Sequence, residues 1–176
     1  IVCLSGQVPT HLIGNDAFQE ADTTGITRPC TKHNYLVKDV QKLCSTLHEA
    51  FHVARSGRPG PVVIDLPKDI QLSECEYVNR QDRHGRRYKP STDLNKDKII
   101  QVAKLLVNAK KPIIYGGGGL INSGPESSKL LKELVNITGI PTTLTLMGLG
   151  ALPCDHKLFL GMLGMHGTYE ANLSMY

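Results

Sequence analysis

The sequence predicts an α/β fold that is divided into two parts. Short apolar runs that suit buried strands alternate with stretches in which apolar residues recur every three or four positions, as in amphipathic helices. This pattern fades over a charged stretch in the middle of the chain and then resumes. We therefore expect one α/β domain over residues 1–72, a linker over residues 73–93 and a second α/β domain over residues 94–176.

The first part opens with a predicted strand and a loop. Residues 1–5 are an apolar run that suits a buried strand, and the glycine-containing residues 6–20 leave its carboxyl end. Ligands of parallel α/β sheets bind beyond the carboxyl ends of the strands, so polar side chains of this loop are site candidates. These candidates are Gln7, Asp16 and Gln19. An ordinary connection, with a short helix over residues 17–20 capped by Asn15 or Asp16, explains the pattern equally well.

A strand, a helix and a second strand complete the first part. Residues 26–37 are predicted to be extended, with a bend at Pro29. An apolar stripe over residues 39–54 predicts an amphipathic helix. Residues 62–66, which are apolar except for Asp65, predict a buried strand. Together these elements predict a parallel crossover unit.

The charged stretch between the two parts has no periodicity. Its charged residues between positions 80 and 90 are Arg80, Asp82, Arg83, Arg86, Arg87 and Lys89. A basic tract can bind phosphate, but no aromatic residues alternate with it for stacking, so a solvated linker is the better interpretation. The net charge of +4 is mild and no apolar run is long enough to span a bilayer. We therefore expect neither a nucleic acid nor a membrane as a partner.

The second part repeats the α/β pattern. It predicts a helix, a strand, a second helix and a second strand over residues 94–106, 113–115, 125–137 and 140–146, in that order. The last stretch, residues 158–176, is predicted to be a loop that enters a helix near residues 167–172. A glycine run at residues 116–119 follows the first of these strands, where backbone could approach a phosphate closely. Its spacing matches neither a dinucleotide fingerprint nor a P-loop, so a tight turn without a ligand is at least as good an interpretation.

Few other side chains form a recognisable reaction centre. The five scattered cysteines are typical of reduced thiols in a cytosol-like compartment. Cys30 and His33, with Cys44 and His48, superficially resemble a zinc site, but the second pair lies in a predicted helix and no tetrahedral arrangement is forced. No nucleophile motif is present. Arg58 could clamp a phosphate or carboxylate, or could simply cap the preceding helix.

Several longer motifs resemble the large catalytic subunits of the acetolactate synthase family, which are thiamine diphosphate enzymes. The motifs are GQVP at 6–9, IGNDAFQE at 13–20, TKHNYLV at 31–37, SGRPGPVVIDLPKDIQ at 56–71, TLMGLG at 145–150 and LGMLGMHGT at 160–168. The resemblance covers nearly the whole chain. It implies that residues 1–72 end a domain that binds the pyrimidine of the thiamine, and that residues 94–176 begin a central, doubly wound parallel α/β domain that binds FAD.

The resemblance also implies roles for individual residues. Gln19 corresponds to the family's active-site glutamine beside the thiamine. The positions that correspond to the substrate and inhibitor channel are Pro9, Ala17, Phe18 and Lys68. The positions that correspond to FAD contacts are Arg58, Gly118, Thr145, Leu146, Leu163, Gly164, Met165 and His166. Plant members carry paired arginines where this chain has Thr10 and His11, so the resemblance implies nothing about inhibitor sensitivity.

The activity that the resemblance implies is the condensation of two pyruvates, or of pyruvate and 2-ketobutyrate, with loss of carbon dioxide in branched-chain amino acid biosynthesis. The implied cofactors are thiamine diphosphate, Mg²⁺ and FAD. The implied partners are further catalytic subunits, in a dimer or tetramer, and a small regulatory subunit, in the cytoplasm. Alternatives are a related thiamine enzyme, such as glyoxylate carboligase or a 2-ketoacid oxidase, and a non-catalytic flavin-binding module.

Two family elements are not found in this sequence. The glutamate that activates the thiamine ring is expected before residue 1, and the Gly-Asp-Gly motif that binds diphosphate and magnesium is expected after residue 176. We therefore expect the chain to be an internal fragment without metal ligands of its own and without synthase activity by itself.

Overall fold

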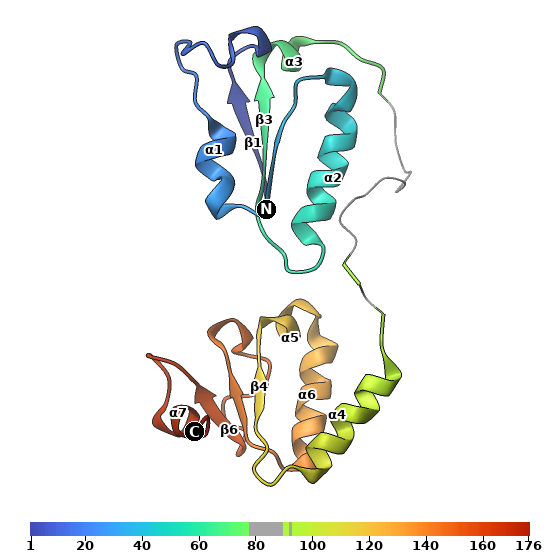
Figure 1. The fold of residues 1–176 in the computed structure, drawn as a ribbon, viewed down its shortest axis with the longest axis vertical. Coiled ribbons are helices and arrows are strands. Elements are labelled where there is room, and N and C mark those ends of the chain that lie inside the picture. Colours follow the sequence, from blue (N-terminus) through green and yellow to red (C-terminus); the bar gives the residue numbers. More distant parts are fainter. Residues whose placement is uncertain (78–89, 92) are drawn as a thin grey trace. The chain divides into compact units, whose positions relative to one another are not determined.

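The computed structural model describes residues 1–77, 90, 91 and 93–176. The chain divides into two compact units, Ile1–Thr92 and Asp93–Tyr176. Each unit contains a three-stranded parallel sheet with helices beside it (Figure 1). The predicted α/β fold is therefore confirmed. The basic side chains from Arg80 to Lys89 lie outside the described residues, so the assignment of residues 73–93 as a linker between two domains stays a prediction.

The sheet of the first unit has the strand order β1-β3-β2. These strands span Val2–Gln7, Val62–Pro67 and His33–Leu36, in that order. β3 lies in the middle, and its side chains Val62 and Ile64 are completely buried. A central strand that is covered on both faces requires a nearly continuous apolar run, which is why the sequence predicts this strand well.

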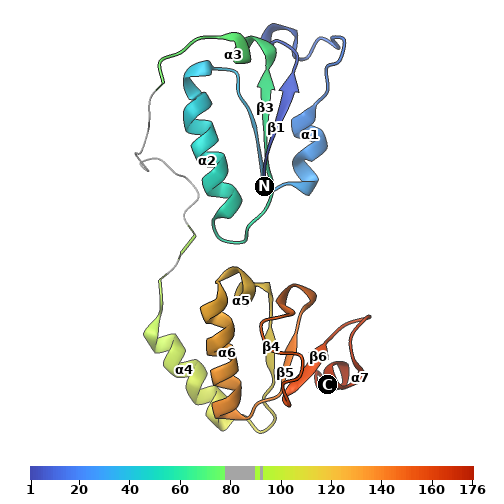
Figure 2. The ribbon, with the colours of Figure 1, turned by 180° about the vertical axis from the view of Figure 1, so that it is seen from behind.

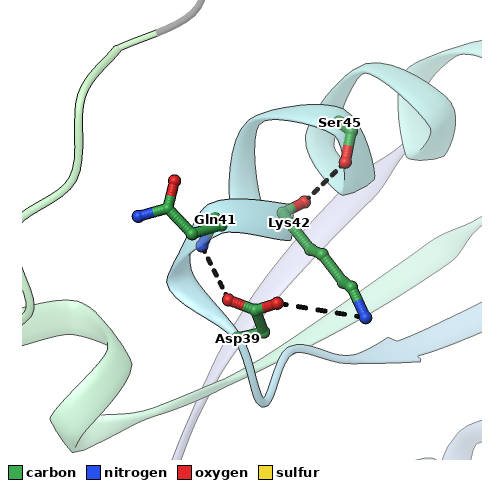
Figure 3. Close-up of polar contacts among 4 residues, drawn as sticks. All are labelled: Asp39, Gln41, Lys42 and Ser45. Atoms are coloured by element: carbon green, nitrogen blue, oxygen red, sulfur yellow. Dashed lines mark hydrogen bonds and ion pairs between the residues drawn. The ribbon is translucent and has the colours of Figure 1, made fainter.

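Helix α2 (Leu43–Arg55) forms the predicted parallel crossover between β2 and β3. A short 3₁₀ helix, η3 (Val40–Lys42), leads into it. Asp39 caps this start, because its Oδ1 accepts a hydrogen bond of 3.0 Å from the backbone N–H of Gln41 (Figure 3). The other carboxylate oxygen of Asp39 pairs with the ammonium of Lys42 at 3.9 Å. The carboxylate therefore holds the first turn by contacts within four residues of sequence.

The face that α2 buries contains Val53 in place of Phe51 of the predicted stripe. Ala50, Val53 and Ala54 are buried in the core of the first unit. Phe51, which the stripe includes, is 59 % exposed, because its position is turned by about 100° from that of Ala50 around the helix. At the end of the helix, the ammonium of Lys32 donates to the carbonyl of Val53 at 2.6 Å, where a cation favours the helix dipole.

Strand β1 is confirmed, but the prediction that it is buried is wrong. Among the described strands it pairs with β3 alone and therefore forms an edge of this sheet. Cys3 is exposed and Leu4 is 61 % exposed. An apolar run predicts a strand, whereas its burial depends on which neighbours cover it.

The short helix predicted over residues 17–20 does not form. Asp16 and Gln19 have φ angles of 51° and 65°, in the left-handed region, so a right-handed helix cannot include them. The helix starts later, as α1 (Thr23–Thr27), and Asp22 caps it by accepting from the N–H of Gly25 at 2.9 Å.

The extended segment predicted over residues 26–37 is only partly correct. Its first residues finish α1 and form a 3₁₀ helix, η2 (Arg28–Cys30), and β2 begins at His33. Pro29 lies in the first turn of η2, where its missing N–H costs no hydrogen bond.

The sheet of the second unit has the strand order β4-β5-β6, again parallel (Figure 2). The strands span Ile114–Gly116, Thr142–Leu144 and Phe159–Met162. β4 and β5 confirm the two predicted strands. β6 lies where a loop was predicted, because Gly161, at a φ of 90°, and a register irregularity opposite β5 interrupt the alternation that marks a strand.

Four helices accompany this sheet. They are α4 (Lys96–Asn108), α5 (Gly118–Asn122), α6 (Pro125–Thr138) and α7 (Tyr169–Leu173). α6 begins with proline in its first turn and ends at Gly139, whose φ of 67° is the left-handed cap that glycine favours, as the sequence predicts. α4 confirms the other predicted helix, but most of its apolar side chains are exposed in this unit and only Leu106 among its leucines is half-buried. None of the described helices is long and apolar enough to span a bilayer.

Replacing Ile64 by alanine tests the central position of β3. We expect the Ile64→Ala substitution to lower the free energy of unfolding by about 2–5 kcal/mol, because a completely buried side chain leaves a cavity. Leu4→Ala on the exposed edge strand is the control and is expected to change it by less than about 1 kcal/mol. Denaturant unfolding measures the free energy of unfolding of both variants. Equal decreases for the two would contradict a central β3 and an edge β1.

Candidate cofactor and active site

The carboxyl edge of the first sheet gathers residues that are far apart in sequence. The 3₁₀ helix η1 (Thr10–Leu12) follows β1, and α3 (Lys68–Leu72) follows β3 at the same edge. The N–H of Thr10 donates to Asp69 Oδ1 at 3.0 Å, and the Thr10 hydroxyl donates to the other oxygen of the same carboxylate. The hydroxyl bond is the main cause that lowers the pKa of Asp69. These contacts bring the neighbouring predicted channel positions, Pro9 and Lys68, to one place.

The segment that carries Gln19 is folded by a single carboxylate. We call residues 14–20 the Gln19 loop. Glu20 Oε1 accepts from the N–H of Gly14 at 2.5 Å, and Oε2 accepts from the N–H of Ala17 at 3.0 Å. These backbone donors, Gly14 first, hold the pKa of Glu20 below its usual value. The backbone of Glu20 also donates to the carbonyl of Ala17 at 2.9 Å, which closes a tight turn around Phe18 and Gln19.

The side chains at the tip of this loop are available to a ligand. Phe18 is 89 % exposed and Gln19 is exposed beside it. An aromatic ring offers a flat apolar surface, and a neutral amide offers both a donor and an acceptor without taking up a proton at neutral pH. The structure therefore presents two of the predicted site residues together, with Ala17 half-buried at their base.

A buried carboxyl group anchors the end of the loop to the sheet. Gln7 Nε2 donates to Asp65 Oδ2 at 2.9 Å and to the carbonyl of Ala21 at 2.7 Å. Asp65, in the central strand, is only 2 % exposed. Burial raises the pKa of Asp65, and side-chain contacts with Gln7, Thr23 and Ser5 oppose that shift. The amide of Gln7 therefore joins β1, β3 and the residue that follows the Gln19 loop.

Arg58 does not lie with these residues. It is exposed in the connection between α2 and β3, at the amino end of β3, whereas the Gln19 loop lies beyond the carboxyl end of β1 (Figure 1). The six residues of β3 separate the two ends by about 17 Å. The structure therefore assigns Arg58 to a different surface of the first unit from Gln19.

The predicted FAD positions of the second unit lie at the carboxyl edge of its sheet. Gly118 follows β4, and Thr145 and Leu146 follow β5. The N–H of Thr145 donates to the carbonyl of Gly116 at 2.9 Å, and its hydroxyl accepts from the N–H of Gly148 at 3.1 Å. Gly118 lies directly against this turn, since a Cβ there would be 2.9 Å from the Cβ of Met147.

The remaining predicted positions form a loop after β6 at the same edge. They are Leu163, Gly164, Met165 and His166. The side chain of Asn172, in α7, makes two hydrogen bonds to the backbone of this loop. Its Oδ1 accepts from the N–H of Gly164 at 2.8 Å, and its Nδ2 donates to the Gly164 carbonyl at 3.0 Å. Met165 and His166 are exposed. The carboxyl edge of the second sheet therefore presents glycine backbone beside exposed apolar side chains, an arrangement that ligand sites of parallel α/β sheets share.

Neither the cysteines and histidines nor the cavity of the second unit forms a site with the predicted residues. In the described part of the chain no group of His, Cys, Asp and Glu side chains could hold a metal ion, which argues against a zinc site at Cys30, His33, Cys44 and His48. No disulfide joins the cysteines, all of which are described. A cavity of about 710 Å³ in the second unit is lined by residues that precede β4 and β5 and by α7, and it contains none of the predicted site residues.

Sequence reasoning missed the carboxylates that shape the first site. Glu20 was placed in a predicted helix, and Asp69 was not singled out. The available signal for Glu20 was a glycine six residues before it. A third carboxylate, Asp65, was visible as the polar residue of an otherwise apolar strand. Neither signal identifies a partner, because each contact depends on how the backbone turns between the two residues.

Comparison with known proteins gives matches along the whole chain. Residues 99–176 match the family model described as the central domain of thiamine pyrophosphate enzymes. The whole chain is 51 % identical to the acetolactate synthase isozyme 3 large subunit of Escherichia coli K12, and covers 31 % of that protein. It is 47 % identical to an acetolactate synthase of Mycobacterium bovis, with 97 % of this chain and 27 % of the relative aligned. It is also 47 % identical to the chloroplastic acetolactate synthase of Arabidopsis thaliana, with 99 % and 26 % aligned. The chain spans less than a third of the length of these relatives.

The ionisation of Asp65 gives a test by pH. A carboxyl whose pKa is raised on folding favours the native state when protonated, and that contribution is lost as the pH rises through its folded pKa. We expect Asp65→Asn, which keeps an oxygen for Gln7, to be more stable than the original chain at neutral pH. The difference in stability between the variant and the original chain should vanish below about pH 4, where Asp65 is protonated and therefore as neutral as the asparagine. Thermal unfolding across this range measures the difference, and a variant that is less stable only at neutral pH would contradict it.

Proposed function

The chain is a homologue of acetolactate synthase large subunits along its whole length, and we propose that it forms part of an enzyme that condenses two pyruvates, or pyruvate and 2-ketobutyrate, with loss of carbon dioxide. The observation that supports this most strongly is the 51 % identity to the Escherichia coli large subunit over the entire chain. In this proposal the enzyme acts in branched-chain amino acid biosynthesis in the cytoplasm.

The first unit would supply one wall of the active site. Gln19 is the proposed catalytic residue, because its exposed amide can donate to a ketoacid carbonyl or to a developing oxyanion without competing for the proton. Phe18 and Ala17 would border the substrate beside it. Pro9 and Lys68, which Thr10 and Asp69 hold together, would line the approach, with the ammonium of Lys68 attracting the substrate carboxylate.

The cofactors divide between the two units. Thiamine diphosphate, when bound, supplies the carbanion chemistry that ketoacid decarboxylation needs. The loops at the carboxyl edge of the second sheet would bind FAD through Gly118, Thr145, Leu146 and residues 163–166. Arg58 is also proposed to contact FAD, as the motif at residues 56–71 implies. Mg²⁺ would accompany the diphosphate of the thiamine cofactor.

The proposed partners are a second catalytic subunit, in a dimer or tetramer, and a small regulatory subunit. The name "large subunit" of several relatives supports a smaller partner. A related enzyme such as glyoxylate carboligase or a 2-ketoacid oxidase, or a non-catalytic flavin module, is not favoured, because the curated relatives reported above are acetolactate synthases.

Acetolactate formation from pyruvate, with thiamine diphosphate, Mg²⁺ and FAD present, tests the function in the full-length protein. We expect turnover there and none from the isolated 176-residue chain. Gln19→Ala is expected to lower kcat/KM by about 10- to 100-fold, because it removes a donor to the reacting group. Gln41→Ala, an exposed glutamine at the start of α2, is the matched control and should leave kcat/KM unchanged.

Each outcome has a separate meaning. A full-length protein that makes no acetolactate would contradict the function. Equal kinetics for the Gln19 and Gln41 variants would remove only the role of Gln19, and turnover by the isolated chain would show that the site is complete without further residues.

Two neighbouring glycines test the FAD site. Gly118→Ala should weaken FAD binding about tenfold, because the new methyl group would collide with Met147 and displace the turn after β5. Gly119→Ala is the control, since no heavy atom lies within 4 Å of a Cβ at that position. Flavin fluorescence titration of the full-length protein measures both, and equal affinities would argue against a flavin at this edge.

A further inference from the structure

The Gln19 loop has an unusual backbone. Three of its residues lie in the left-handed region, with φ angles of 90° at Gly14, 51° at Asp16 and 65° at Gln19. Glycine adopts this conformation freely, but for other residues it is energetically unfavourable. A loop with two such residues persists only when contacts to the rest of the structure hold it. The contacts that hold Asp16 and Gln19 therefore decide where the side chain of Gln19 lies.

Glu20 supplies those contacts. Its bonds to the N–H groups of Gly14 and Ala17 span the left-handed Asp16. The bond from its own N–H to the carbonyl of Ala17 closes the second turn, in which Gln19 is the left-handed residue. Both carboxylate oxygens and the backbone of one residue thus fix both turns. No other described side chain makes a hydrogen bond to the N–H of Gly14 or of Ala17.

The ends of the loop are anchored separately. Gln7 holds the carbonyl of Ala21, and Thr10 is held by Asp69. The side chain of Asn15 donates to the carbonyl of His11 at 3.1 Å, which joins the loop to η1. These contacts decide where the loop is attached, whereas its internal shape depends on Glu20. Loss of the Glu20 carboxylate would therefore leave the loop attached and the backbone bond from Glu20 to Ala17 in place, but would remove both side-chain contacts that hold the turns in their left-handed shape.

The Glu20 carboxylate is also poorly suited to act on a substrate directly. Its two oxygens are occupied by backbone donors, and these bonds favour the ionised form by lowering its pKa. A carboxylate held in this way is a weak base and has little freedom to approach a ligand. The geometry of Glu20 is therefore explained better by an effect on the position of Gln19 than by direct contact with the substrate.

We propose that Glu20 is a positioning residue, whose carboxylate binds the backbone of Gly14 and Ala17 and thereby holds Gln19 in the left-handed conformation that aims its amide at the ketoacid. The inference rests on the proposed function of Gln19. In this inference Glu20 sets the shape of the Gln19 loop. Glu20 is therefore not a catalytic residue, because it does not touch the substrate.

A double-mutant cycle in the full-length enzyme tests the inference. The variants are Gln19→Ala, Glu20→Gln and the two combined, with acetolactate formation measured as kcat and KM. Glu20→Gln keeps the length of the side chain, but one oxygen becomes an NH₂ group that faces a backbone N–H, so one of the two bonds is lost. We expect it to lower kcat/KM about tenfold. In the Gln19→Ala background the same change should cost less than about twofold, because the group that it positions is absent.

Asp39→Asn is the matched control. Asp39 uses its carboxylate in the same way, on the backbone N–H of Gln41, but at the exposed start of α2 (Figure 3). We expect kcat/KM to be unchanged for this variant, and the thermal midpoint of both Asp39→Asn and Glu20→Gln to stay close to that of the unmodified enzyme. If Glu20→Gln does not fold, Glu20→Asp, which keeps both oxygens on a side chain shorter by one methylene, replaces it in the same cycle.

The outcomes separate the inference from the proposed function. Losses that multiply in the double variant would show that Glu20 acts independently of Gln19 and would overturn the inference alone. Unchanged kinetics for Glu20→Gln would also overturn it. A Gln19→Ala variant with unchanged kinetics would instead contradict the role of Gln19, and the positioning role would fail with it.

Discussion

Parallel strand pairing is the constraint on which both candidate sites depend. When all strands of a sheet run in the same direction, every connection that leaves a strand starts from the same edge. Pro9 and Lys68 are therefore neighbours at one edge of the first sheet, although they are 59 positions apart, as are Thr10 and Asp69, which bond to each other. The loops after β4, β5 and β6 share an edge for the same reason. The pairing is possible only because helices such as α2 carry the chain back to the start of the next strand.

Elements with a strong apolar period could be predicted from the sequence, and those shaped by other contacts could not. β3, α2 and α6 have patterns long enough to be distinctive, and caps such as Pro125 and Gly139 mark their ends. β6 was missed because a left-handed glycine interrupts it. The exposure of β1 was missed because an apolar run does not reveal whether its strand lies at an edge.

The candidate sites show the same division. Motif resemblance singled out Gln19 and the proposed FAD positions by number, because it depends on residue type and order alone. It did not reveal that Gln19 has a left-handed backbone, or that one carboxylate folds the surrounding residues. These properties arise from contacts between atoms, and a local sequence pattern predicts them only when the pattern is a known cap or turn.

The left-handed backbone at Gln19 limits how this position can change during evolution. β-Branched residues are excluded by their backbone preference, whatever their chemistry. Asparagine tolerates the conformation better and keeps an amide, but its side chain reaches less far by one methylene. Glycine would relieve the backbone strain and remove the amide altogether. A lineage that accepted glycine here would gain stability as it lost the amide, so under the role proposed for Gln19, selection for a robust fold and selection for turnover act in opposite directions on this one residue.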